Sequence, residues 1–208
     1  MVLSIRKGTL LDKKVITSYF DKLATKWDEH NVTDDEKIKW ILDVAGVKAA
    51  TTILDVACGT GVLFPYYLDR NVSHVIGVDI SGEMTRIARS KIHDSRVEVI
   101  CADIETLPIH TFCDSCIVYN AFPHFLDPKR LIARLAEWVK PEGHLTIAHS
   151  MGLEALRKHH AGRAEHVSRE MLSKEELANI LHMSGFEVCT MVSDVEKYLV
   201  SGVRLDTV

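Results

Sequence analysis

The sequence predicts an α/β protein, in which a parallel sheet is covered by helices on both faces. From residue 52 onward, short apolar runs alternate with segments whose apolar residues recur at helical spacing. The first run, ILDV, leads into a turn that contains Gly59 and Gly61. Because 47% of the 208 residues are hydrophobic, the chain has enough apolar side chains for the core of such a sheet.

Two helices are expected before the first strand. Residues 14–29 carry apolar side chains at helical spacing. Residues 33–36 read TDDE, a capping box in which the Thr33 hydroxyl accepts a hydrogen bond from the first turn. This box predicts a second helix that ends at about residue 44.

The remaining elements follow from the same alternation. The expected strands are 52–56, 74–79, 96–101, 114–119 and 144–149, and the expected helices lie near 61–69, 82–92 and 127–139. A second capping box begins at Ser173, and its helix ends at Gly185. Residues 186–192 and 196–200 are expected to form a closing hairpin.

Charge and cysteine content favour a cytoplasmic protein that acts on small molecules. The formal net charge is −4 and the isoelectric point is near 6.2, whereas proteins that track nucleic acids are usually basic. The chain has no apolar run of the ~20 residues that a membrane helix needs. The five cysteines suit reduced thiols. Cys113 and Cys116 are three residues apart on a predicted strand, so they should face opposite sides, which argues against a redox or zinc site.

Carboxylates follow the second and third predicted strands. Asp79 lies 18 residues after Gly61, where it can accept hydrogen bonds from both hydroxyls of a ribose. Asp103 follows the third strand, where it can meet the edge of an adenine. Each aspartate is also well placed to cap a helix. Phe64 stands where the dinucleotide-binding fingerprint has its third glycine.

These segments resemble the successive motifs of the class I S-adenosylmethionine-dependent methyltransferases. The matching stretches are ILDVACGTG, VIGVDIS, VICADIETLP, DSCIVYNAF and WVKPEGHLTI, in order within residues 15–150. The opening YFDKLATKWDEHN is similar to the ubiquinone/menaquinone methyltransferase group, but YNAFPHF stands where that group has Arg-Asn-Val. The resemblance implies a doubly wound, Rossmann-like sheet of seven strands, mostly parallel with the last strand antiparallel. It also implies S-adenosyl-L-methionine as the cofactor.

The resemblance further implies which residues hold the cofactor. The loop around its methionine part would be formed by Asp55, Ala57, Gly59 and Gly61, and Asp79 would hold the ribose.

The resemblance also implies which residues lie near the transferred methyl group and which contact the adenine. Asn120 would lie near the transferred methyl group, and Trp27 is expected to close over the cofactor. The adenine would contact Ile80, Met84, Asp103 and Ile104.

Histidines are the candidate catalytic residues, namely His124, His149 and His160. The first two follow the fourth and fifth strands, and the third lies in a basic, histidine-rich insertion. One interpretation is a lid that binds an anionic substrate, with a histidine as the base. A second is a metal site built from His149, His159 or His160, and His166, although no carboxylate partner is evident. A third is a solvated helix with surface histidines. We expect no metal.

The sequence therefore predicts a single methyltransferase domain, 1–208. It comprises cap helices at 14–47, a cofactor-binding core at 48–150, a substrate or lid insertion at 151–172, and a closing helix and hairpin at 173–208. The expected reaction is in-line methyl transfer to a small, polar or anionic acceptor, by a monomer or homodimer that binds neither nucleic acid nor membrane. The alternatives are an NAD(P)-dependent oxidoreductase and a non-catalytic S-adenosylmethionine-binding regulatory protein.

Overall fold

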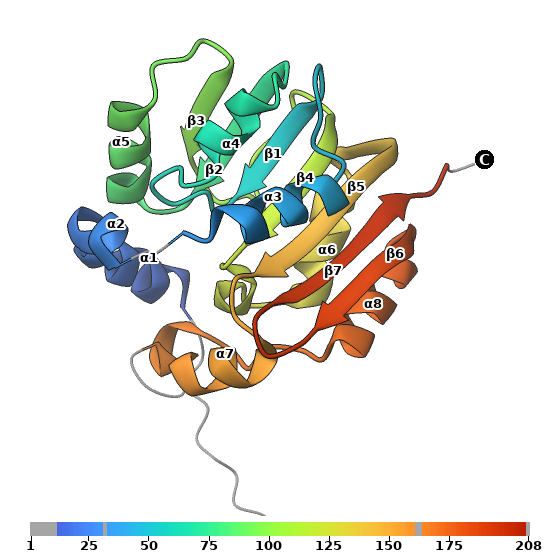
Figure 1. Ribbon diagram of the computed structural model, residues 1–208. Coiled ribbons are helices and arrows are strands. Elements are labelled where there is room, and N and C mark those ends of the chain that lie inside the picture. The colour runs from blue at the N-terminus through green and yellow to red at the C-terminus, as the bar shows by residue number, and fades with distance from the viewer. Residues whose placement is uncertain (1–11, 31–32, 161–163, 207–208) are drawn as a thin grey trace, which may run out of the picture.

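The computed structural model describes residues 12–30, 33–160 and 164–206, and within them the strands form a seven-stranded sheet (Figure 1). The strands are β1 (Thr52–Val56), β2 (His74–Asp79), β3 (Val97–Cys101), β4 (Cys113–Tyr119), β5 (Val139–His149), β6 (Phe186–Ser193) and β7 (Tyr198–Arg204). Their order is β3-β2-β1-β4-β5-β7-β6. Strands β1 to β5 are parallel, and β7 is antiparallel to both β5 and β6. The predicted fold class is confirmed.

Helices cover both faces of the sheet. One face packs against α3 (Asp35–Val44), α4 (Phe64–Asp69) and α5 (Gly82–Lys91). The other packs against α6 (Pro128–Ala136) and α8 (Lys174–Met183).

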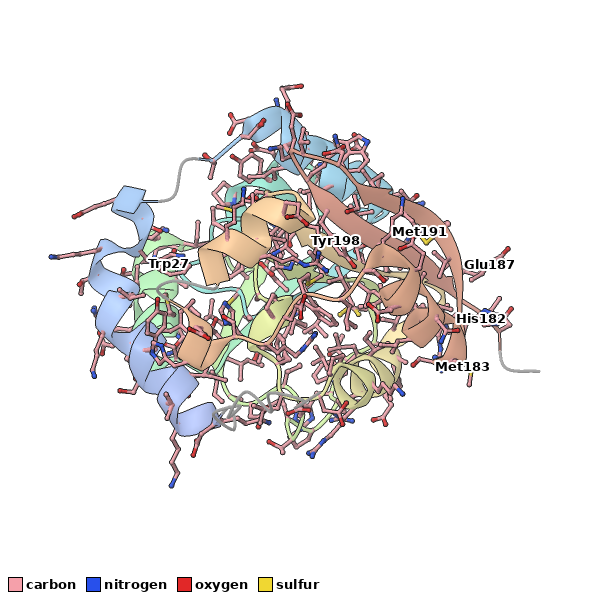
Figure 2. All side chains as sticks on the ribbon, turned by 90° about the horizontal axis from the view of Figure 1, so that it is seen from below. Trp27, His182, Met183, Glu187, Met191 and Tyr198 are labelled. Atoms are coloured by element: carbon pink, nitrogen blue, oxygen red, sulfur yellow. The ribbon has the colours of Figure 1, made fainter. Side chains whose placement is uncertain are left out.

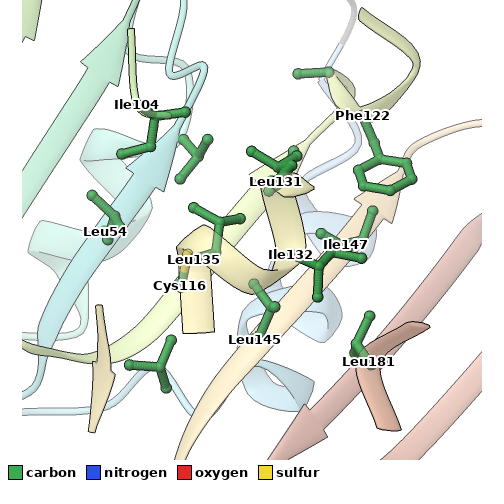
Figure 3. Close-up of a cluster of buried hydrophobic side chains, with 14 of the residues drawn as sticks. Leu54, Ile104, Cys116, Phe122, Leu131, Ile132, Leu135, Leu145, Ile147 and Leu181 are labelled. Carbon is green, nitrogen blue, oxygen red and sulfur yellow. The ribbon is translucent and has the colours of Figure 1, made fainter. Parts of the chain in front are cut away.

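The larger apolar cluster lies between α6, α8 and the sheet (Figure 3). Leu131, Ile132 and Leu135 of α6 are fully buried against strand residues that include Leu145 and Ile147. Burying each such side chain contributes about 1.5–3 kcal/mol. The amphipathic sequence of residues 127–139 therefore fixes this helix against the central strands.

The remaining helices gather at the carboxyl ends of the parallel strands (Figure 1). They are α1 (Lys13–Leu23), η1 (Ala24–Lys26), α2 (Trp27–His30), η2 (Phe122–His124), α7 (Leu153–His160) and η3 (Glu165–Val167). Ile16 of α1 packs with Ala164 and Val167, so the N-terminal helices and the segment after β5 meet over this end. No helix in the described part of the chain has both the length and the apolar character to cross a bilayer.

The start of α3 corrects one prediction. The N-cap is Asp34, whose Oδ1 accepts a hydrogen bond from the Lys37 amide at 3.0 Å, and not Thr33. Because both residue types are good N-caps, the local sequence allowed either register. The capping box at Ser173 is confirmed, with reciprocal bonds between Ser173 and Glu176.

The two cysteines of β4 correct another prediction. Cys113 and Cys116 are both fully buried in the same apolar cluster, rather than on opposite sides of the sheet. The register of β4 against β5 shifts between Cys113 and Ser115. Between these positions β4 advances two residues while β5 advances five, from Val139 to His144, so regular pairing of β4 with β5 holds only from Ser115 onward. Both thiols are free and fully buried, and burial raises the pKa of Cys116 well above its usual value, so Cys116 is not a reactive thiol.

Candidate functional site

The loop after β1 has a left-handed backbone that only glycine adopts without steric cost. Ala57, Gly59 and Gly61 all have positive φ, at 55°, 55° and 79°. A Cβ on Gly61 would lie 2.6 Å from the ring of Phe64, and one on Gly77 would also lie 2.6 Å from that ring. The fully buried Phe64 therefore fills the space beneath the loop and needs glycine on both sides of its ring.

Asp79 links this loop to the end of β2. Its Oδ2 accepts a hydrogen bond from the Gly59 amide at 2.9 Å, and its Oδ1 accepts one from the Ser81 amide at 2.8 Å. Burial raises the pKa of Asp79, although these bonds to the carboxylate oppose the rise. Ser81 rather than Asp79 caps α5, since its hydroxyl accepts from the Met84 amide.

A second carboxyl group lies at the root of the glycine loop. Asp55 is 2% exposed, and its Oδ2 has no hydrogen-bond partner among the described residues. Burial, together with the charge of Asp79, raises the pKa of Asp55 to about 8. Two buried carboxyl groups favour a positive charge beside them, because it would offset their repulsion and desolvation. The loop therefore suits a ligand that carries a cationic group.

The N-terminal helices are bound to this edge by aspartates. Asp21 of α1 accepts hydrogen bonds from the Ser81 hydroxyl at 2.5 Å and from the Glu83 amide at 3.2 Å. Asp28 of α2 accepts one from the Thr60 hydroxyl at 2.6 Å. These contacts attach the cap to the first turn of α5 and to the glycine loop itself.

Lys13 and Trp27 complete the covering of this edge. The Lys13 ammonium forms ion pairs with Asp103 and Glu105, in the loop after β3. The indole nitrogen of Trp27 lies 3.9 Å from the position that a Cβ on Gly59 would occupy. Trp27 thus lies over the glycine loop, and the loops after β1, β2 and β3 all contact the cap.

A cavity of about 390 Å³ lies between α1 and the loop after β2. Its volume is in the range of small-molecule sites. Met84 and Ile104 are only 2% and 5% exposed, so they support this region from within the core. The residues that line the cavity are Lys13, Lys14, Thr17, Ser18, Asp21 and Ile80.

Asn120 joins the carboxyl ends of β4 and β5. Its φ is 54°, a left-handed backbone that asparagine tolerates better than most residues. Its Oδ1 accepts a hydrogen bond from the Ser150 amide at 2.8 Å, and its Nδ2 donates to the Ser150 hydroxyl at 3.1 Å. The side chain is thereby fixed at the edge where ligands bind in α/β sheets.

His124 contacts both α1, through Phe20, and η3, through Val167. Its Nδ1 lies 2.9 Å from the Val167 carbonyl oxygen and 3.2 Å from the Ser168 hydroxyl, and its ring centre lies 4.9 Å from that of Phe20. A carbonyl oxygen can only accept, so Nδ1 carries a proton. In the neutral ring the basic lone pair is therefore on Nε2.

The other histidines are dispersed. His149 is buried at the end of β5, with its ring centre 6.2 Å from that of Tyr198, whereas His166 packs against Tyr19 on the cap. The side chain of His160, at the end of α7, lies outside the described residues. Within the described residues, no group of three or more histidines, cysteines or carboxylates is arranged to hold a metal ion.

The residues that attach α1 and α2 to the rest of the protein could not be predicted from the sequence. Lys13, Asp21 and Asp28 contact partners 90, 60 and 32 residues away, and no local motif marks such pairs. The only signal available was the placement of charged side chains among the apolar residues of 14–29. Figure 2 views the molecule from the end that the cap covers, with Trp27 on the N-terminal side and Tyr198 nearer the middle.

Comparisons with known proteins identify the family of the central part of the chain. Residues 54–147 match the family described as a methyltransferase domain. Malonyl-[acyl-carrier protein] O-methyltransferase from Acetivibrio thermocellus is 30% identical over 142 residues, which are 67% of this chain and 50% of that protein. This chain spans about half the length of the curated relatives that it matches first.

Solved structures share the fold. One chain of the Haloferax volcanii complex that contains the methyltransferase activator Trm112 has a TM-score of 0.80 and 20% identity, covering 92% of this chain and 98% of that chain. Magnesium protoporphyrin IX methyltransferase from Synechocystis, with bound S-adenosylhomocysteine, has a TM-score of 0.70 and 17% identity, covering 93% and 100%. The fold is that of the S-adenosylmethionine-dependent methyltransferases. This chain belongs to that class and carries its methyltransferase domain.

Proposed function

We propose that the protein transfers a methyl group from S-adenosylmethionine to a small, polar or anionic acceptor. The observation that carries this proposal is the glycine loop. In it, Asp79 accepts a hydrogen bond from the Gly59 amide, and Asp55 is buried at the root of the loop. This loop offers a cationic amino acid group both a close backbone approach and nearby negative charge. Asp79 would bind the ribose hydroxyls, and Asp55, Ala57, Gly59 and Gly61 would surround the methionine part.

The adenine end of the cofactor would occupy the cavity between α1 and the loop after β2. Ile80 lines that cavity and would pack against the purine, with Trp27 closing the opposite end over the glycine loop. The Asp103 carboxylate would meet the adenine amino group in place of part of its ion pair with Lys13. The side chains that support this subsite from the core are Met84 and Ile104.

In methyl transfer, the main task of the protein is to position the acceptor against the methyl group. S-adenosylmethionine supplies a methyl group that its positive sulfur already activates. The chain would hold the acceptor in line beneath α1 and η3, and these elements would exclude water from the site. Asn120 would lie beside the transferred group. His124 would take the acceptor's proton at Nε2, since Nδ1 is occupied by the Val167 carbonyl, and His149 and His160 are the other candidate bases.

Two observations bear on the choice of acceptor. The relative from Acetivibrio thermocellus is an O-methyltransferase that acts on a malonyl group carried by a protein. Arg169, in the basic 151–172 insertion, lies with its guanidinium against the ring of Phe122, in the loop after β4. Both favour an oxygen acceptor on an acidic molecule.

Calorimetric titration tests the cofactor directly. S-adenosylmethionine and S-adenosylhomocysteine should bind, and NADH should not, because Phe64 fills the place of the third glycine that a pyrophosphate needs. Asp79→Ala should weaken S-adenosylhomocysteine binding more than tenfold, since the charge-assisted bonds to the ribose are lost. The matched control is Asp69→Ala, an exposed aspartate at the end of α4.

The alternatives predict different results. Binding of NADH alone would indicate an oxidoreductase, and unchanged affinity in Asp79→Ala would remove Asp79 from the site. Tight binding of both sulfur ligands, with no transfer of radiolabelled methyl to any of a panel of carboxylic acids, phenols and amines, would favour a regulatory cofactor-binding protein.

A further inference from the structure

Two polar groups without partners lie on the acceptor side of the site. One is Nη2 of Arg169, which is buried and makes no hydrogen bond to the described residues. The other is the hydroxyl of Tyr198, a fully buried residue whose oxygen also has no partner there. Most buried donors in folded proteins are paired, so two orphans in one region call for an explanation.

The rest of the Arg169 side chain is held rigidly. Its Nε donates to the Phe125 carbonyl at 3.1 Å, and its Nη1 donates to the Glu170 carbonyl at 2.9 Å. The guanidinium carbon lies 4.7 Å from the ring centre of Phe122, and the Arg169 amide donates to the Pro123 carbonyl at 2.8 Å. These contacts orient the guanidinium against the loop after β4 and leave one N–H edge unused.

No carboxylate among the described residues forms an ion pair with this guanidinium. The neighbouring Glu170 carboxylate pairs with Arg157, and an Asp127 oxygen instead accepts amides at the start of α6. Burial lowers the pKa of Arg169 to about 10, and the group remains charged at neutral pH. Arg169 is partly buried, and desolvating a cation that has no ion-pair partner is costly, so the region is suited to an anion.

Tyr198 brings the second donor to the same side of the molecule. It begins β7 and pairs in register with His149, at the carboxyl end of β5. Burial, and after it the Glu175 carboxylate, raise the pKa of Tyr198, whereas the Arg169 charge opposes this rise, so the guanidinium lies within electrostatic range of the phenol. Figure 2 shows Tyr198 near the middle of the end that the cap and α7 cover.

We propose that Arg169 and Tyr198 form a subsite for a carboxylate of the methyl acceptor. One carboxylate presents two acceptor oxygens and a single negative charge, which matches one guanidinium N–H, one phenol O–H and a single cation. A water molecule could accept both hydrogen bonds but would leave the arginine charge unneutralised. This inference rests on the proposed function, because it identifies the acceptor of that reaction.

The test is calorimetric titration of the S-adenosylhomocysteine-loaded protein with malonate, and with malonamide as its neutral analogue. Malonate should bind and malonamide should not. Tyr198→Phe and Arg169→Gln should each weaken malonate binding at least tenfold, and Arg169→Lys should fall between the wild type and Arg169→Gln. Arg157→Gln is the matched control, because this exposed arginine already pairs with glutamates, and its malonate affinity should stay within twofold.

The thermal unfolding of Tyr198→Phe separates a binding role from a structural one. Because the hydroxyl has no partner, its removal should leave Tm unchanged or slightly higher while malonate binding falls. A lower Tm with unchanged malonate affinity would overturn the proposal, as would equal binding of malonate and malonamide, or no malonate binding to loaded wild-type protein. Failure of the wild type to bind S-adenosylhomocysteine would instead refute the proposed function, and that titration is made first.

Discussion

At the scale of single residues, the site depends on groups whose protonation the fold has changed or fixed. Asp55 is held neutral over much of the pH range by burial and by Asp79, whereas His124 is held in one tautomer by a backbone carbonyl. These two effects come from contacts with segments distant in sequence. They therefore give predictions that the isolated motifs do not.

Asp55 should make the ligand-free protein less stable as pH rises. In the folded state its carboxyl keeps a proton up to about pH 8, whereas in the unfolded chain it loses that proton near pH 4. Between these values the folded state binds more protons, so the free energy of unfolding falls with pH, by up to about 1.4 kcal/mol per unit. Urea unfolding at pH 5, 6.5 and 8 should show a flatter dependence for Asp55→Asn. Asp69→Asn should follow the wild type, and equal slopes in all three proteins would contradict the assignment.

His124 should matter for turnover and not for cofactor binding. Asparagine at this position can still donate to the Val167 carbonyl but has no basic nitrogen in place of Nε2. His124→Asn is therefore expected to lower methyl transfer about 100-fold, in the range of general-base effects, and to leave S-adenosylhomocysteine affinity within twofold. The measurement is single-turnover transfer of radiolabelled methyl. Ser168→Ala, which removes the weaker contact to Nδ1, serves as the control, and wild-type rates for His124→Asn would exclude it as the base.

At the scale of elements, the loop, β2 and α4 form one packing unit around a single ring. The Phe64 side chain, from the first residue of α4, lies under Gly61 of the loop and against Gly77 of β2. The cap is a second unit, which Asp21 and Asp28 attach to the first. The positions of the loop residues therefore depend on both units.

Gly77→Ala should destabilise the protein by about 1–3 kcal/mol, because the new methyl group would overlap the Phe64 ring. Adding Phe64→Leu should recover part of that loss, which a double-mutant cycle of urea midpoints would measure. Gly82→Ala is the control, since a Cβ there meets no atom within 4 Å and should be neutral or slightly stabilising. Additive effects of Gly77→Ala and Phe64→Leu would argue against this packing.

At the scale of the whole molecule, the N-terminal helices α1 and α2 and the segment after β5 meet the sheet at the carboxyl ends of its strands. A cofactor bound there would contact several of these parts, and only in the folded state. Saturation with S-adenosylhomocysteine at 100 times its Kd should add about 2.7 kcal/mol to the free energy of unfolding. For a chain of this size, Tm should rise by roughly 5–10 °C. Differential scanning calorimetry would detect this shift, and NADH at equal concentration should give none.

The strands of the sheet and the glycine loop after β1 could be predicted from the sequence. Strand alternation and the glycine turn are local patterns, and the structure has them where they were predicted, with ends displaced by a few residues. The prediction of Thr33 as the N-cap was wrong because the neighbouring Asp34 caps the helix equally well. The predicted facing of Cys113 was wrong because the pairing of β4 with β5 is irregular before Ser115. The cap contacts and the Arg169 environment depend on tertiary packing, which no periodicity encodes.

The ring of Phe64 also limits how this protein can change its ligand during evolution. A lineage that exchanged it for glycine, to admit a phosphate-bearing nucleotide, would leave a void the size of a benzyl group between Gly61 and Gly77. Filling that void requires a larger residue at one of those glycines, and Gly61 needs its left-handed backbone. The first step on such a path is thus strongly destabilising before any new affinity arises. Selection would retain the present cofactor class for reasons of folding, independently of catalysis.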